Sequence, residues 1–202
     1  MKDTNGQTRE QDYFVRHEGG TDRIPLAEAL ALPRTPISGI LDNLRSAHNV
    51  GSIFRTCDGA GASHLSICGI SPLPPHRHLA KTALGAVDVV PWTHFETVAE
   101  AIESTTVEGA QILALEFTND SVPLTEIELR FPVVLVAGNE KDGLSEETLA
   151  LCDATVHMPM LGHKNSLNVS VAFGIALYEI LRRYQIQNPP QFSSGARRET
   201  AR

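Results

Sequence analysis

Residues 158–172 read Met-Pro-Met-Leu-Gly-His-Lys-Asn-Ser-Leu-Asn-Val-Ser-Val-Ala. They place a proline, a glycine and a polar run where a buried strand is expected to lead into a helix. Ser166 and Asn168 then open the most apolar helix predicted in the chain. One polar residue would suffice for an ordinary helix N-cap, and this segment carries several more. Because open α/β sheets bind ligands at loops that follow the carboxyl ends of strands, this segment is a candidate binding loop.

Short β-rich runs alternate with helical patterns through the middle of the chain. The predicted strands are 37–41, 65–70, 88–91, 111–117, 133–137 and 155–158, and the predicted helices are 50–60, 78–85, 98–104, 146–152 and 167–184. Several strands are continuous apolar runs, which is typical of a parallel sheet covered on both faces. The sequence therefore predicts the α/β class, with a parallel sheet between helices.

The composition predicts one domain with a tail at each end. The chain has 202 residues, of which 42% are hydrophobic, enough for a single sizeable core. Residues 1–22 are polar and rich in glycine, and residues 188–202 show no apolar period, so both are expected to be flexible tails around a domain at 23–187. The net charge of -7 excludes a protein whose whole surface binds nucleic acid but permits a local basic patch.

The cysteines and the apolar runs indicate the cellular compartment in which the protein is expected. Cys57, Cys68 and Cys152 form no Cys-x-x-Cys pair, which indicates buried thiols in a reducing compartment and no metal site. The first residues are too polar for a signal peptide, and the longest apolar stretch, 169–181, is too short to span a bilayer. We therefore expect a cytoplasmic protein that does not engage a membrane.

A polar block at 43–56 surrounds the start of a predicted helix. Asn49 is predicted to cap that helix. Gly51 stands in the first turn, where glycine costs helix stability, so another group is expected to approach the backbone there. Arg55 follows one turn later, where it could bind an anion. Taken alone, a capped surface helix with a solvated arginine is the favoured interpretation of this block.

Two further polar blocks follow predicted strands. The strand at 133–137 ends at Gly138, and Glu140 and Gly143 come next. Alone, this block is best explained as a turn. In the functional alternative, Gly138 lets a ligand approach the main chain and Glu140 orients a partner. In the third block, Ser166 and Asn168 lie in an apolar setting. Because buried amides and hydroxyls need hydrogen-bond partners, the interpretation as a simple loop with an N-cap is weaker there.

Together, the three blocks resemble the sequence motifs of the SpoU (TrmH-like) RNA ribose methyltransferases of the SPOUT superfamily. The family's motifs are Asn-x-Gly-x-x-x-Arg, Gly-x-Glu-x-x-Gly, and Pro-Met-x-Gly followed by Ser-Leu-Asn-Val-Ser-Val-Ala. They are matched here by Asn49, Gly51 and Arg55, by Gly138, Glu140 and Gly143, and by residues 159–172. The order and spacing agree as well, and three ordered motifs between residues 43 and 183 are specific to this family.

The resemblance implies a particular fold and cofactor. Family members have a parallel sheet whose C-terminal part forms a trefoil knot, a topology otherwise nearly absent from proteins. The knot loops bind S-adenosylmethionine in the family. The residues that would hold it here are Leu115, Gly138, Met158, Ser166 and Leu167. Met158 stands where the family usually has isoleucine, a mild change if shape and main chain decide the contact.

The resemblance implies methyl transfer to a ribose 2′-hydroxyl. The residues that would carry it are Arg55, Asn49, Glu140, Ser166 and Asn168. Arg55 is the family's proposed catalytic residue. A guanidinium stays protonated in proteins, so we interpret Arg55 as a clamp on the neighbouring phosphate that stabilises the developing alkoxide, rather than as a general base. The other four residues would orient Arg55, the ribose and the knot loops.

The resemblance also implies a homodimer, with active sites near its interface, and a tRNA or rRNA substrate. The cations available for RNA are Arg45, His48, Arg55, Arg77, Lys81, Lys164, Arg182, Arg183 and the Arg197-Arg198 pair. Two alternatives stay open. One is a SPOUT-fold RNA-binding protein without catalysis. The other is a nucleotide- or NAD-dependent enzyme on an ordinary doubly wound sheet, against which the lack of a strand-associated Gly-x-Gly-x-x-Gly argues.

Overall fold

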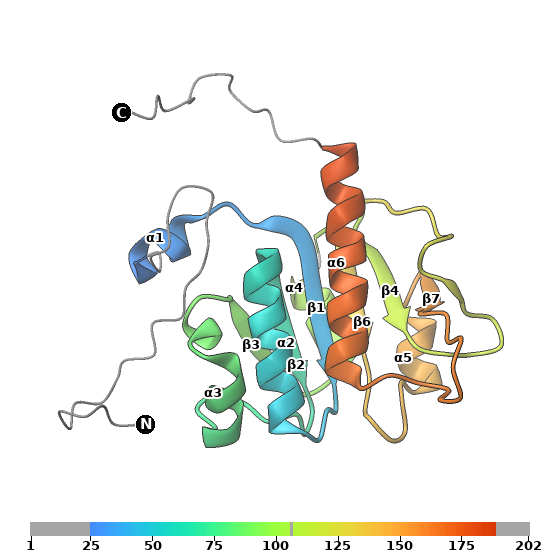
Figure 1. Ribbon diagram of the computed structural model, residues 1–202, viewed down its shortest axis with the longest axis horizontal. Helices are drawn as coiled ribbons and strands as arrows, with labels where there is room; N and C mark the ends of the chain where they lie inside the picture. Colours follow the sequence, from blue (N-terminus) through green and yellow to red (C-terminus); the bar gives the residue numbers. More distant parts are fainter. Residues whose placement is uncertain (1–24, 106, 189–202) are drawn as a thin grey trace, which may run out of the picture. The chain divides into compact units, whose positions relative to one another are not determined.

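A computed structural model describes residues 25–105 and 107–188 (Figure 1). Both predicted tails, apart from Asn188, lie outside the described residues. The chain divides into two units, Met1–Pro33 and Arg34–Arg202. In the first unit, the short helix α1 (Leu26–Ala31) follows Pro25 and was not predicted from the sequence. The second unit contains the sheet and the site.

The second unit is built on a seven-stranded sheet of parallel strands in the order β3-β2-β1-β6-β4-β7-β5. The strands are β1 (Thr35–Asp42), β2 (Ala62–Cys68), β3 (Trp92–Phe95), β4 (Gln111–Leu115), β5 (Val122–Pro123), β6 (Val133–Ala137) and β7 (Ala154–His157). The predicted parallel α/β sheet is therefore confirmed.

The register brings the carboxyl ends of four strands level with one another. Leu41 of β1 pairs with Ala137 of β6, and Ala137 pairs with Leu115 of β4. Leu115 in turn pairs with Val156 of β7. The chain thus leaves β1, β6, β4 and β7 along one edge of the sheet, where open α/β sheets hold their ligands. The three polar blocks of the sequence follow β1, β6 and β7, so this edge collects them.

Helices cover the sheet on both faces. They are α2 (Ala47–Ala60), α3 (Arg77–Ala83), α4 (Val98–Thr105), α5 (Glu146–Ala150) and α6 (Val169–Gln187). In Figure 1, α2, α3 and α6 lie in front of the sheet, and α4 lies behind it. Each of these helices was predicted, with ends that differ by at most three residues from those observed.

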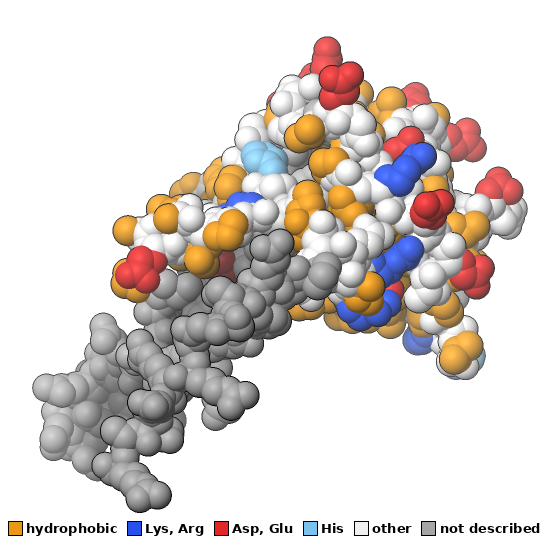
Figure 2. All heavy atoms as spheres, turned by 90° about the horizontal axis from the view of Figure 1, so that it is seen from above, with side chains coloured by type: hydrophobic (Ala, Val, Ile, Leu, Met, Phe, Trp, Pro, Cys, Tyr) orange, Lys and Arg blue, Asp and Glu red, His pale blue; other side chains and the backbone are white. Residues whose placement is uncertain are grey.

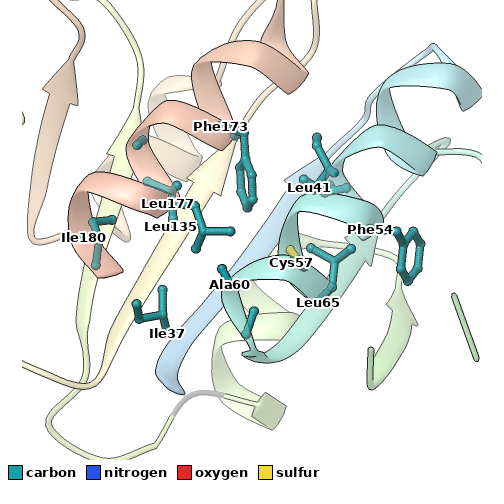
Figure 3. Close-up of a cluster of buried hydrophobic side chains, with 14 of the residues drawn as sticks. Ile37, Leu41, Phe54, Cys57, Ala60, Leu65, Leu135, Phe173, Leu177 and Ile180 are labelled. Atoms are coloured by element: carbon teal, nitrogen blue, oxygen red, sulfur yellow. The ribbon is translucent and has the colours of Figure 1, made fainter. Parts of the chain in front are cut away.

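The two faces of β6 explain why that strand is apolar throughout. Leu135 belongs to the larger hydrophobic cluster, together with Phe54 of α2 and Phe173 of α6 (Figure 3). Val134 and Val136 point to the opposite face, where they join a second cluster that contains side chains of α4. Because both faces are buried, an alternating pattern is absent.

One predicted strand, 88–91, is wrong. Residues Ala86–Asp88 form a 3₁₀ helix instead, and the amide of Val90 donates to the carbonyl of Ala86 at 2.9 Å. The strand that pairs with β2 begins only at Trp92. The two valines have high β-propensity, which is why a strand was predicted. In the structure, Val90 is buried while it belongs to a turn, so burial did not require a strand. The two-residue strand β5 was not predicted either.

The cysteines agree with the expectation of buried thiols for two of the three positions. All three are free, with Cys57 and Cys68 buried and Cys152 half-buried. Burial raises the pKa of Cys57 and Cys68 to about 12 and that of Cys152 to about 11, so these thiols stay protonated and unreactive. Among the described residues, no helix combines the length and the apolar character needed to cross a membrane.

Candidate functional site

A cavity of about 460 Å³ opens at the carboxyl edge of the sheet. Its walls come from three separate segments, which follow β4, β6 and β7 and end in the first turns of α6. The lining residues are Leu115, Glu116, Phe117, Gly138, Asn139, Glu140, Lys141, Gly143, His157, Met158, Met160, Asn165, Ser166, Leu167, Asn168, Val169 and Ala172. The volume suits a small organic ligand. All five residues predicted to hold a cofactor line this cavity.

The backbone conformation of the turn after β6 explains why Gly138 and Gly143 are glycines. A Cβ at Gly138 would lie 2.6 Å from the carbonyl carbon of Gly143. Gly143 has a φ of 70°, in the left-handed region that favours glycine. The amide of Gly143 donates to the carbonyl of Asn139 at 2.9 Å and closes the turn. The folding of the turn therefore explains Gly138 without any ligand, and only its position on the cavity wall connects it with binding.

Glu140 ties the turn after β6 to the start of α2. One carboxylate oxygen accepts the amide of Arg45 at 2.8 Å. The other accepts the amide of Ser46 at 3.1 Å and the side-chain amide of Asn49 at 2.8 Å. A second link joins the same loops, because the side-chain amide of Asn139 donates to the carbonyl of Asn43 at 2.7 Å. The first and second polar blocks are thus locked together.

Asn49 does not cap α2, contrary to the prediction. The helix begins at Ala47, and Ser46 is its N-cap, with a hydroxyl that accepts the amide of Asn49 at 3.3 Å. Because the helix starts three residues earlier than predicted, the Asn49 side chain is available as a bridge. It donates to Glu140, and its oxygen accepts the side-chain amide of Asn168 at 3.2 Å. Asn49 therefore joins all three polar blocks.

Asn168 is the N-cap of α6, which begins two residues later than predicted. Its side-chain oxygen accepts the amides of Ser170 and Val171 at 3.0 and 3.4 Å and the Ser170 hydroxyl at 2.7 Å. The same side chain reaches Asn49 through its amide group. Asn168 thus satisfies the amino end of α6 and fixes that end relative to α2. Ser166, two residues earlier, lines the cavity.

The hydrogen bonds around Glu140 decide its charge state. Partial burial raises its pKa, but the donors of Arg45, Asn49, Ser46 and its own amide outweigh burial, and the net pKa is lowered. Glu140 is therefore a carboxylate at neutral pH and can only accept hydrogen bonds. This suits a group that positions loops and does not suit a general acid.

Arg55 lies apart from this cavity in the single chain. It is exposed on α2 and lines a second cavity, of about 550 Å³, with Ser52, Thr56, Lys81, Thr82, Leu84 and Tyr178. Gly51 on the same helix has a structural explanation, because a Cβ there would overlap the Leu79 carbonyl and the Thr82 hydroxyl of α3. The group that approaches the backbone at Gly51, as predicted, is therefore another helix.

Several cavity residues were not identified from the sequence. Glu116 accepts the amide of Leu144 at 3.1 Å and so holds the turn after β6 from the other side. His157 accepts from or donates to the Ser121 hydroxyl at 2.9 Å, and its ring meets Phe117 edge-on, with 5.1 Å between centroids. The available signal was position, since Glu116 and His157 stand at the carboxyl ends of β4 and β7.

Comparison with known proteins identifies the family. The model of the SpoU rRNA Methylase family matches residues 37–178 of the chain. The chain belongs to this family. It is 32% identical over 160 residues to the tRNA (guanosine(18)-2'-O)-methyltransferase of Escherichia coli, an alignment that covers 79% of this chain and 69% of that protein.

Two solved SpoU-family structures share the fold. The TrmH/SpoU tRNA modifying enzyme of A. aeolicus superposes with a TM-score of 0.71 at 31% identity, over 81% of this chain and 82% of the other. The AdoMet-bound rRNA methyltransferase of Sinorhizobium meliloti superposes with a TM-score of 0.68 at 31% identity, over 81% of this chain and 62% of the other. The arrangement of sheet and helices in this SpoU-family chain is therefore one already seen with that cofactor bound.

Proposed function

We propose that this SpoU-family protein is an enzyme that transfers a methyl group from S-adenosylmethionine to a ribose 2′-hydroxyl in tRNA or rRNA. The observation that carries the proposal is the convergence of three distant segments on one cavity, joined by the bridge from Glu140 through Asn49 to Asn168. Relatives named for the same reaction on tRNA, and an AdoMet-bound relative named for rRNA, support it.

The residues present fit the proposed cofactor. Leu115, Met158 and Leu167 offer apolar surface for a flat adenine ring, and Gly138 and Ser166 offer main-chain and hydroxyl groups for its polar edges. When bound, S-adenosylmethionine supplies a methyl group carried on a positively charged sulfur. Glu116 and Glu140 line the same cavity, so their carboxylates would be available to offset that positive charge.

In the proposed mechanism, the protein acts mainly by positioning. Asn49, Glu140 and Asn168 hold the three loops in a fixed relation, so the reacting atoms can be aligned for an in-line displacement. Arg55 holds the phosphate beside the target ribose and stabilises negative charge on the 2′-oxygen as its proton leaves for that phosphate or for water.

The proposal includes a homodimer, because Arg55 and the cofactor cavity lie on different parts of one chain. Val171, Ile175 and Tyr178 on one side of α6 are 49%, 43% and 48% exposed, an unusual content of apolar surface for a helix so close to a site. Tyr178 also lines the cavity of Arg55, so the apolar stripe runs from one cavity toward the other. A second copy packed on this stripe would offer its Arg55 to the first copy's cavity.

The proposal also includes the trefoil knot. Strand β7 lies between β4 and β5, which are consecutive in the chain, as expected if the C-terminal segment passes through the chain that joins those two strands. The segment that follows β5 contacts α6, because Arg183 donates to the carbonyls of Leu124, at 3.0 Å, and of Ile127. These two features are what threading requires. The proposed compartment is the cytoplasm, where the three free thiols would stay reduced.

Methyl transfer from radiolabelled S-adenosylmethionine to total tRNA and to rRNA tests the proposal. We expect label in one RNA class, resistant to alkaline cleavage at the 3′ side of the modified ribose. Arg55→Ala is expected to reduce kcat about 100-fold while cofactor binding is retained. Arg130→Ala, which removes another exposed arginine, serves as the matched control. RNA binding without label would instead indicate a SPOUT-fold binding protein that does not catalyse.

A further inference from the structure

Positive charge is concentrated on two segments of an otherwise acidic chain. Residues 43–57 and 71–87 contain no Asp or Glu, and they carry Arg45, Arg55, Arg77 and Lys81. The other 13 Lys and Arg residues share the rest of the chain with all 24 Asp and Glu residues. On the face seen in Figure 2, acidic side chains stand at many points among few cations. The two basic segments are therefore a separate electrostatic region.

The two segments form one surface, because α2 and α3 pack directly against each other. The absence of a side chain at Gly51 lets α3 approach, and the Thr82 hydroxyl donates to the His48 carbonyl at 3.2 Å. Three imidazoles gather on this surface. The rings of His48 and His78 are 5.2 Å apart between centroids, and those of His76 and His78 are 5.7 Å apart. All three histidines are exposed.

The second cavity extends the same surface with fixed charge. Arg55 and Lys81 provide two cations, and the remaining polar lining consists of hydroxyl groups. Those hydroxyls belong to Ser52, Thr56, Thr82 and Tyr178. No acidic residue lines this cavity. The Thr56 and Thr82 hydroxyls donate to main-chain carbonyls. The two cations, with the hydroxyls of Ser52 and Tyr178, form a suitable environment for a phosphate group.

The histidine row also reaches the first cavity. His48 is followed directly by Asn49, whose side chain binds Glu140 on the wall of that cavity. Two other cations proposed for RNA are engaged elsewhere, since Arg182 pairs with Glu179 at 2.8 Å and Arg183 donates to main-chain carbonyls. The α2–α3 surface is thus a basic region that adjoins the site.

We propose that this α2–α3 surface is the track of the substrate RNA strand, with Lys81 and Arg55 holding a backbone phosphate and His48 and His78 stacking on bases. The inference rests on the proposed function and adds the surface that recognises the substrate. A polymer is favoured over a free nucleotide, because three rings and two separate cations exceed what one phosphate and one base can engage. Imidazole stacking and phosphate contacts are how proteins commonly hold single-stranded RNA.

Salt-dependent RNA binding by the full chain tests the inference. Fluorescently labelled total tRNA is titrated with protein at several KCl concentrations and pH 8. Lys81→Ala is expected to lower the slope of log affinity against log salt by about 0.7 to 0.9, the loss of one phosphate contact. The double variant His48→Ala, His78→Ala is expected to weaken binding about fivefold or more with little change of slope.

The control is Arg130→Ala, which removes an exposed arginine outside both segments and should match the wild type. Thermal unfolding and calorimetric binding of S-adenosylmethionine check that each variant keeps its fold and first cavity. If Lys81→Ala and the histidine double variant bind like Arg130→Ala while the wild type methylates RNA, the track is wrong and the proposed function stands. If the wild type fails to transfer methyl, the proposed function fails, and the salt slopes still decide the track.

Discussion

Glu140 illustrates how one residue can hold a site together without taking part in the chemistry. Its carboxylate accepts two main-chain amides at the start of α2 and the side chain of Asn49. Glutamine has nearly the same shape, but it can turn only one oxygen to these donors, and its amino group would face main-chain N–H groups. The charge of Glu140, rather than its size, is therefore what the loops require.

We predict that Glu140→Gln lowers kcat/KM for RNA methylation about tenfold or more, because hydrogen bonds from Arg45, Ser46 and Asn49 to the carboxylate are weakened or lost and the loops lose their alignment. The measurement is steady-state methyl transfer at pH 7.5, with circular dichroism to verify the fold. Glu103→Gln on α4, which neutralises an exposed carboxylate elsewhere, is the control and should retain full activity. Equal activity of the two variants would refute this role for Glu140.

The lowered pKa of Glu140 predicts a pH dependence of stability. A carboxyl whose folded pKa lies below its ordinary value of 4.5 stabilises the fold above that ordinary pKa and loses this contribution as pH falls through the folded pKa. The difference in unfolding free energy between wild type and Glu140→Gln should stay constant from pH 8 to about 5.5 and shrink below about pH 4.5. Urea denaturation at each pH measures it, and a difference that grows on acidification would show the opposite sign.

The site residues differ in how far the sequence could reveal them. A polar cap close to residues 166–168 was predictable because capping is a local property of the residues around a helix start, although the predicted start at 167 did not identify Asn168 as the cap. Asn49 was predicted as a cap too, yet Ser46 holds that position, and the partners of Asn49 lie about 90 and 120 residues away in the chain. The resemblance grouped the three blocks, but only tertiary structure shows which atoms meet.

At the scale of elements, the contact between α2 and α3 depends on the missing side chain of Gly51. In an exposed helix, Gly→Ala is expected to stabilise by about 1 kcal/mol. Here the added Cβ would overlap the Leu79 carbonyl and the Thr82 hydroxyl, and a main-chain carbonyl cannot rotate away. The helices would have to separate, and the proposed RNA track would be disturbed with them.

We therefore predict that Gly51→Ala destabilises the protein by about 1–3 kcal/mol, the usual cost of overpacking a close contact. Urea denaturation measures the change. Gly162→Ala is the control, because a Cβ there meets no atom within 4 Å, and it should shift the unfolding free energy little. Stabilisation by Gly51→Ala would mean that helix propensity, rather than helix packing, decides this position.

Helices and strands were predictable where the local pattern of apolar residues was strong. They were not predictable where contacts with distant parts of the chain determine the secondary structure. The buried strand β6 was located at both ends, since five consecutive apolar residues leave few alternatives. The run at 88–91 looked similar, yet its residues turn before β3 begins. The two residues of β5 pair with β7 only because the chain brings them together, so no local pattern marks them.

For the whole molecule, the parallel sheet and its two helical layers could be anticipated, but the strand order could not. The order places β6 between β1 and β4 and β7 between β4 and β5, a result of long-range pairing that hydrophobic periodicity does not record. The same limit applies to Arg55. Its motif was evident in the sequence, whereas its distance from the cofactor cavity became visible only once α2 was placed.

That separation leads to a prediction about assembly. If Arg55 acts in the partner's cavity, an Arg55→Ala subunit still has an intact cavity, and a Glu140→Gln subunit still has an intact Arg55. In a mixed dimer, one of the two sites then combines both intact parts. Random pairing of equal amounts makes about half of the dimers mixed, so the unfractionated mixture should show about a quarter of the wild-type activity and the isolated mixed dimer about half of it.

The two variants are co-expressed with different affinity tags, the mixed dimer is isolated through both tags, and methyl transfer is compared with each parent. Recovery well above both parents would place Arg55 across the interface. If Arg55 served its own subunit, the mixed dimer would hold one site without Arg55 and one without Glu140, and activity would stay at the level of the parents. Co-purification also reports assembly directly, since subunits that do not associate cannot pass both columns. The exposed stripe of Val171, Ile175 and Tyr178 is where that association is expected, so Ile175→Lys should abolish both the mixed dimer and the recovered activity.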